Sequence, residues 1–81
     1  MKFRDVRIIL LKEWDPLCVG DNPHLADEYD SFIPDLIREI QHGADIAAIS
    51  ESLRKIEIKL EVNPPSGQRV RAAKRLVKMR A

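Results

Sequence analysis

The chain has 81 residues, of which 44% are hydrophobic and 33% charged, and its formal net charge is +1. This composition is typical of a globular domain, not of a disordered chain, and the length allows a single domain with a small core. One cysteine excludes an intrachain disulfide and fits a reducing compartment, and no apolar run approaches the ~20 residues of a membrane span, so we expect a cytoplasmic protein without a membrane segment.

The first predicted element is a helix over residues 2–14. Apolar residues recur along it with helical spacing, namely Phe3, Val6, Ile9, Leu10 and Trp14. A strand is the alternative for the short stretch 6–11, which is β-branched at three positions. Pro16 disfavours the helical conformation at residue 15, so we expect the helix to end near Trp14.

Residues 15–27 predict an irregular loop. Pro16, Gly20 and Pro23 favour turns because proline fixes φ and glycine leaves it free. A loop of this length is unusual in so small a domain, and long ordered loops often carry function.

Two further helices are predicted over residues 30–42 and 45–62. The first has an apolar stripe made by Tyr29, Phe32, Ile33, Leu36, Ile37 and Ile40, with Pro34 in its first turn and Gly43 at its end. Asp45 is the expected cap of the next helix, in which apolar residues follow at spacings of 3 and 4 and predict one buried row: Ile46, Ile49, Leu53, Ile56 and Leu60.

The last predicted helix covers residues 67–79, after a break at the sequence Asn63-Pro64-Pro65-Ser66-Gly67. Its apolar positions are Val70, Ala73, Leu76 and Val77. The chain is therefore expected to form one all-α domain over residues 1–81. Short links between the later helices predict a small four-helix bundle, orthogonal or up-down, with sequential helices roughly antiparallel.

Charge is distributed unevenly along the chain. Residues 13–37 contain seven acids and no Lys or Arg, whereas residues 63–81 contain six basic residues and no acid. The two charged poles can meet within the domain, face water, or form partner surfaces.

The acidic stretch supplies our first candidate partner surface. It consists of Trp14, Asp15, Asp21, Asp27, Glu28, Tyr29 and Asp30. Aromatic anchors surrounded by polar groups are the usual pattern of an interaction hot spot. In the alternative, the Trp14 indole closes the end of the core.

A second candidate surface is the basic last helix, with Arg69, Arg71, Lys74, Arg75 and Lys78. These side chains could contact several phosphates of a nucleic acid. The near-neutral domain and the lack of a stacking aromatic in this helix count against that function.

Self-association is a third possibility. Ile8, Leu11 and Ile58 lie off the predicted core stripes, and a two-fold interface would bury them.

Catalytic and metal sites are less well supported by the sequence. Cys18 and His24 match no zinc spacing, and the acids match no calcium loop. Cys18 and His24 could pair as nucleophile and base, but a buried structural cysteine is the simpler interpretation. Acid–base work by Asp27, Glu28 and Asp30 would need a cleft. We therefore expect no catalytic residue, no metal and no cofactor.

Several short motifs resemble those of a family of small, uncharacterised bacterial proteins. They are K-E-W-D-P-L at residues 12–17, A-D-E-Y-D at 26–30 with F-I-P at 32–34, the helix–Gly–Asp turn at 42–45 and L-x-x-I-E at 53–57. The resemblance covers most of the chain to about residue 62. It implies a bacterial, cytoplasmic, helical protein and no catalytic residues. In size and class such proteins are similar to small immunity or antitoxin-like partners.

These observations favour a non-enzymatic protein–protein interaction module that uses the acidic loop against a basic partner. The alternatives are nucleic-acid binding by the last helix and the role of an immunity- or antitoxin-like protein. Another copy of the same chain is also a possible partner.

Overall fold

The computed structural model describes residues 1–80, and within them it contains four helices and no strand. Helix α1 spans Phe3–Ile9 and continues as a π-helical turn, η1, over Leu10–Trp14. Short 3₁₀ turns, η2 (Pro23–Leu25) and η3 (Asp30–Phe32), lead into α2 (Ile33–Gln41). Helices α3 (Ile46–Lys59) and α4 (Ser66–Lys78) complete the chain. The predicted all-α fold class is confirmed, and each predicted helix lies within a few residues of its observed position.

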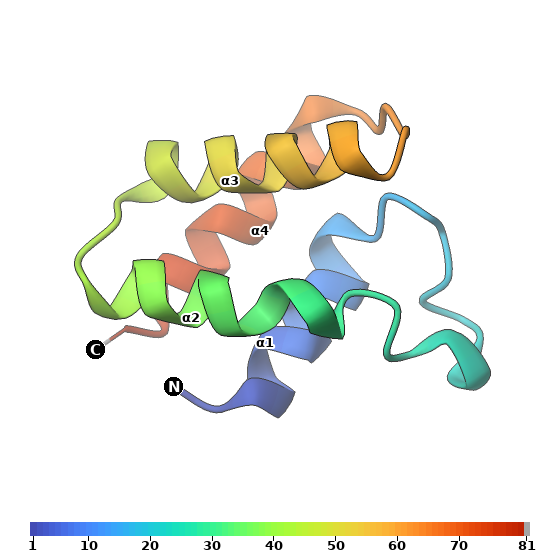
Figure 1. Ribbon diagram of the computed structural model, residues 1–81, viewed down its shortest axis with the longest axis horizontal. Helices are drawn as coiled ribbons and strands as arrows, with labels where there is room; N and C mark the ends of the chain where they lie inside the picture. The colour runs from blue at the N-terminus through green and yellow to red at the C-terminus, as the bar shows by residue number, and fades with distance from the viewer. Residues whose placement is uncertain (81) are drawn as a thin grey trace.

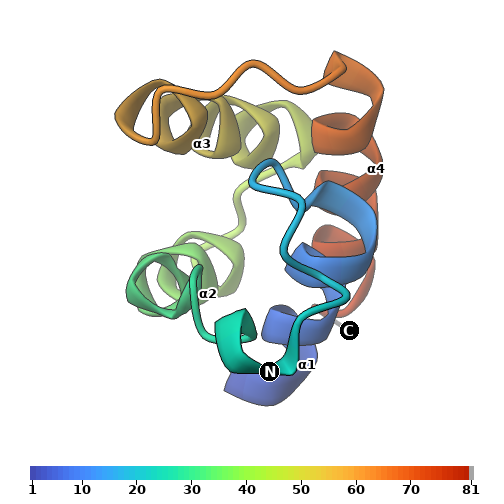
Figure 2. The ribbon, with the colours of Figure 1, turned by 90° about the vertical axis from the view of Figure 1, so that its right-hand side faces the viewer.

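The helices form two layers in a single globule of 31 × 23 × 18 Å. Helices α2 and α3 lie side by side and run in opposite directions in front of α1 and α4 (Figure 1). The view from the side shows the same separation of the two pairs (Figure 2). The irregular segment between η1 and η3 covers one end of the globule, at the right of Figure 1.

The core lies between these layers and draws on all four helices. Its fully buried side chains include Leu10, Trp14, Tyr29, Ile33, Leu36, Ile40, Ile49, Leu53, Ala72, Ala73 and Leu76. Each large aliphatic side chain among them contributes roughly 1.5–3 kcal/mol by leaving water. The two alanines of α4 are small, which lets this helix approach its neighbours closely.

Three residues predicted for the core are instead exposed. Phe3, Ile46 and Val70 have 39%, 38% and 37% of their surface accessible. Phe3 and Ile46 are the first residues of α1 and α3, where the helices begin to project beyond the core. In α4 the buried positions are Ala72, Ala73 and Leu76, a pattern that alanine indicates only weakly.

The predicted helix ends are confirmed by the backbone. Asp15 follows η1 in the left-handed conformation, with φ 34°, and stops the helix directly before Pro16. Gly43 has φ 93° after α2, a conformation that glycine adopts without strain. The Asp45 side chain caps α3 by accepting the Ala48 N–H at 2.8 Å.

Candidate functional site

The candidate site is the acidic loop, which we define as residues 15–30. Its internal organisation centres on the carboxylate of Asp15. The Asp15 Oδ1 atom accepts the backbone N–H of Val19 at 2.9 Å and the hydroxyl of Tyr29 at 2.8 Å, and Oδ2 accepts the N–H of Gly20 at 2.8 Å. A single side chain therefore binds both the first turn of the loop and its far end.

Tyr29 joins the same hydrogen-bond network from the opposite side. Its hydroxyl also accepts the Leu17 N–H at 2.9 Å, and its ring is buried with 1% exposure. The ring centroid lies 5.2 Å from that of Trp14, in a tilted arrangement favourable to aromatic pairs. Burial raises the pKa of Tyr29 well above its ordinary value, and the hydrogen bond to Asp15 acts in the same direction, against the Leu17 donor. The phenol is thus held neutral in the fold.

Gly20 allows the loop to fold back on the end of the first helix. A Cβ atom at this position would lie 2.9 Å from Asp15 Oδ2 and 3.0 Å from the Leu11 carbonyl oxygen. The first distance is shorter than Cβ atoms show in proteins and the second is tight, so a residue with a Cβ would have to displace the Asp15 carboxylate.

The start of the loop is anchored to α3 and α4 through Trp14. The indole Nε1 donates to Oε2 of Glu57 at 2.8 Å, and Glu57 is only 3% exposed. Arg69 in α4 donates to both carboxylate oxygens of Glu57. This buried charge is therefore paired and hydrogen-bonded, as burial requires.

The far end of the loop is anchored to α1. Arg7 donates to both carboxylate oxygens of Asp30, with Nε 3.0 Å from Oδ1. Such a bidentate pair has a fixed geometry. With Asp15, Tyr29 and Trp14, it holds the loop at its two ends, over residues 14–20 and 29–30.

These contacts separate the seven predicted surface residues into three groups. Trp14 and Tyr29 are buried, so their assignment to a partner surface is wrong, and their burial agrees with the alternative in which the indole closes the core. Asp15 and Asp30 are turned to internal partners. Asp21, Asp27 and Glu28 are exposed and form no hydrogen bond or ion pair through their side chains within residues 1–80.

The acidic and basic segments of the chain are in contact at Glu13. Glu13 lies 3.2 Å from Arg71 Nε and 3.8 Å from Arg75 Nη1, while Arg69 is directed to Glu57. Arg69 is therefore not part of an open basic surface. Lys74 and Lys78 are exposed, with no carboxylate within 4.0 Å in the described chain.

The residues predicted for self-association also fall into two groups. Ile8 and Ile58 are 43% and 62% exposed, on α1 and α3. Leu11 packs against the core, so its prediction as an interface residue is corrected. Cys18 requires a correction too: it is exposed and has φ 56°, and is not a buried structural cysteine.

Metal ligands do not gather in the described part of the chain. No three His, Cys, Asp or Glu side chains among residues 1–80 come together in a group that could hold an ion. His24 is exposed, and its backbone N–H donates to Asn22 at the start of η2.

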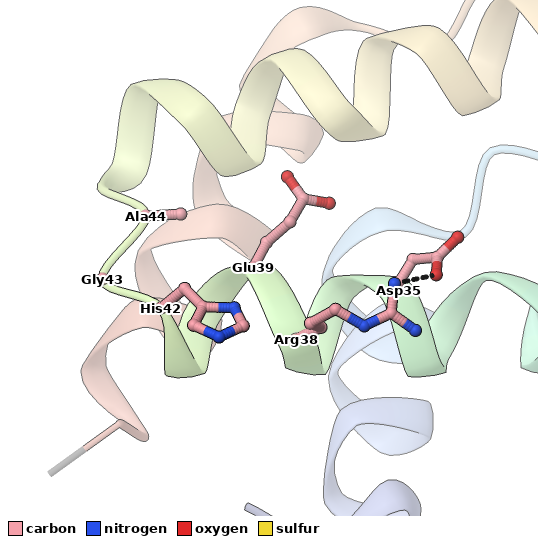
Figure 3. Close-up of a pocket in the computed structure, with 6 residues that line it drawn as sticks. All are labelled: Asp35, Arg38, Glu39, His42, Gly43 and Ala44. Atoms are coloured by element: carbon pink, nitrogen blue, oxygen red, sulfur yellow. Dashed lines mark hydrogen bonds and ion pairs between the residues drawn. The ribbon is translucent and has the colours of Figure 1, made fainter.

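Two hollows beside α2 were not predicted from the sequence. The larger has a volume of about 600 Å³ and is lined by Asp35, Arg38, Glu39, His42, Gly43 and Ala44. In Figure 3 Arg38 lies against Asp35, whereas Glu39 and His42 point in different directions. A smaller groove of about 310 Å³ lies between α2 and α3, where Ser52 donates to Glu39. Because two helices contribute to this groove, no contiguous motif marks it.

Comparison of the chain with family models, curated proteins and solved structures gave no match. The resemblance to small bacterial helical proteins accordingly stays a proposal. No helix within residues 1–80 combines the length and apolar character needed to cross a bilayer.

Proposed function

We propose that the protein is a non-enzymatic interaction module that docks through its acidic loop onto a basic surface of a protein partner. The observation that carries this proposal is that some acids of the loop bind internal partners whereas others face solvent. Asp15 and Asp30 organise the loop from within, while Asp21, Asp27 and Glu28 face solvent without an internal partner in the described chain.

Internal organisation favours binding by this loop. Ordering a flexible segment and its side chains opposes association, by about 0.5–1.5 kcal/mol for each long side chain that is immobilised. Hydrogen bonds of Asp15 to Val19, Gly20 and Tyr29 already hold the backbone at both ends of this loop, so less of the backbone has to be ordered on binding. The loop's exposed carboxylates would then steer a basic partner and select against acidic ones.

The positions of the carboxylates support docking better than they support catalysis. Asp21, Asp27 and Glu28 lie on the exposed outer side of the loop. The hollows along α2, between α2 and α3, and between α1 and α4 are lined by other residues. General acid–base work needs groups within hydrogen-bond reach of a bound substrate.

Nucleic-acid binding by α4 has weaker support. Arg69 is directed to the buried Glu57, and the helix carries no aromatic side chain on which a base could stack. An immunity- or antitoxin-like role is one form that docking to a basic partner would take. That role rests on the resemblance of the motifs alone.

Affinity capture from a lysate of the source cells tests the proposal. The bait proteins are the wild type, the loop variant Asp27→Lys/Glu28→Lys, and the control Glu51→Lys/Glu61→Lys. The control makes the same change in net charge at exposed acids of α3 and its end. Circular dichroism establishes that all three fold.

We expect a basic protein to bind the wild type and the control and to be lost from the loop variant. Equal capture by all three proteins would contradict docking through the loop. Capture that disappears on nuclease treatment would instead favour the nucleic-acid alternative.

A further inference from the structure

We infer that the basic surface bound by the acidic loop is carried by a second copy of this chain, on the outer side of α4. This inference rests on the proposed function, because it names the partner of the same loop. It starts from the charges left without a partner inside the described chain: Asp21, Asp27 and Glu28 on the loop, and Lys74 and Lys78 on α4. Charges that have no oppositely charged partner within one molecule can pair with the charges of a second molecule.

The outer side of α4 presents a continuous row of cations, which we call the basic face: Arg71, Lys74, Arg75 and Lys78. Their spacing of i, i+3, i+4 and i+7 places them on one side of the helix, over a length of about 10 Å. Arg71 and Arg75 keep 61% of their side-chain surface exposed although they contact Glu13. The contact with Glu13 therefore leaves both guanidinium groups open to a further carboxylate.

A hollow with both apolar and charged lining residues adjoins the basic face. It has a volume of about 220 Å³, lies between α1 and α4, and is lined by Asp5, Ile8, Ile9, Arg75 and Met79. Ile8 is 43% exposed there. The loop carries the exposed Pro23 and the half-exposed Leu25 shortly before its acids Asp27 and Glu28. An apolar contact surrounded by charge pairs is the usual anatomy of a protein interface, and it would account for the exposure of Ile8.

The two surfaces lie on different parts of the molecule. The loop covers one end of the globule, whereas α4 lies in the back layer of Figure 1 and at the side in Figure 2. No ion pair joins the loop's exposed acids to α4 within residues 1–80. The loop of one copy therefore binds the basic face of another, either reciprocally in a two-fold dimer or head-to-tail along a series of copies. Exposed charge pairs make such association weak and sensitive to salt.

Sedimentation equilibrium of the untagged full chain tests the inference. We expect the average mass of the wild type to rise with concentration at about 10 mM ionic strength, where charges act over about 30 Å. It should return to that of one chain near 1 M, where they act over about 3 Å. The loop variant Asp27→Lys/Glu28→Lys and the face variant Lys74→Glu/Lys78→Glu should each stay monomeric at both salt concentrations.

Mixing variants supplies the decisive comparison. The loop variant and the face variant have complementary surfaces, so their equimolar mixture should associate again at low salt. The control is Lys55→Glu/Lys59→Glu, which has the same net charge as the face variant but carries its acids on α3 and keeps both the loop and the basic face. By itself this control should associate at low salt as the wild type does if position, and not net charge, determines binding.

Monomeric wild type at low salt, a monomeric Lys55→Glu/Lys59→Glu control, or a mixture of the loop and face variants that stays monomeric would overturn the inference. The proposed function fails separately. A monomeric chain that still captures a basic protein through the loop retains the proposed function and loses only the second copy as partner. Self-association that the loop variant leaves intact would refute self-association through the loop, and capture from the lysate would still decide the loop's role as a docking surface.

Discussion

Asp15 determines the shape of the acidic loop more than any other residue. Its carboxylate accepts three hydrogen bonds, from Val19, Gly20 and Tyr29. Its backbone is left-handed, a conformation that Asp tolerates better than most residues. From the sequence, an Asp before a Pro predicts a turn. The groups that donate hydrogen bonds to this side chain lie up to 14 residues away along the chain, so the Asp-Pro dipeptide does not indicate them.

Replacing Tyr29 with Phe tests the hydroxyl at the centre of the loop. We expect a loss of about 1–3 kcal/mol in the free energy of unfolding at neutral pH, because the Leu17 N–H and Asp15 lose a partner. The pKa of Tyr29 is higher in the fold than its ordinary value. The neutral phenol therefore contributes fully below about pH 10, and its contribution falls by about 1.4 kcal/mol per pH unit above that.

The difference between wild type and Tyr29→Phe in urea unfolding should consequently narrow as the pH rises above about 10. A difference that stays constant up to about pH 11 would mean that the hydroxyl is not held neutral in the fold.

A Gly20→Ala substitution tests the close approach of the loop to the first helix. The added methyl group would meet Asp15 and the Leu11 carbonyl, so we expect a destabilisation of about 1–3 kcal/mol. The matched control is Gly67→Ala, where no atom lies within 4 Å of the new Cβ. That change, in the first turn of α4, should be neutral or stabilising by up to about 1 kcal/mol. Equal effects of the two changes in urea unfolding would refute the tight fit at Gly20.

At the level of elements, the helices were predictable because apolar spacing and end signals agree. Pro16, Gly43 and Asp45 mark helix boundaries that the backbone confirms. The predicted row in α3 was only partly right, because Glu57 is buried whereas Ile56 is only half-buried. A glutamate is assigned to the surface by its type. Its burial depends on Trp14 and Arg69, which approach it from other elements.

The buried Glu57–Arg69 pair joins α3 to α4 and supports the Trp14 indole. Replacing Arg69 with Met leaves the carboxylate buried without its charge partner, so we expect a loss of about 3–5 kcal/mol. The control Arg54→Met removes an exposed pair with Glu51, for which about 0–1 kcal/mol is expected. Thermal and urea unfolding of both variants would measure the difference. Comparable losses would show that burial does not strengthen the pair.

At the level of the whole molecule, the sequence predicted an irregular acidic loop but not which side chains form its exposed surface. The acidic stretch forms one end of the globule (Figure 1), a position that the run of acids and turn residues did not predict. The sequence could not show which side chains face inward. Trp14 and Tyr29 appeared as surface anchors because they flank the loop, yet they pack against each other in the core.

The loop's exposed acids should be separable from its stability. Because Asp27 and Glu28 face solvent, Asp27→Lys/Glu28→Lys is expected to change the free energy of unfolding by no more than about 0.5 kcal/mol. A loss of more than about 2 kcal/mol would show that these side chains hold the loop together and that it is not organised by Asp15 alone.

The central claim is that the acidic loop is ordered before it meets a partner. Backbone ¹⁵N relaxation of the free protein tests it most directly, through the order parameters of residues 17–29. We expect order parameters of about 0.85, equal to those of the helices, including the amides of Val19 and Gly20 that bond to Asp15. Values below about 0.6 along the loop would contradict it, because the acids would then belong to a flexible segment and not to a preformed docking surface.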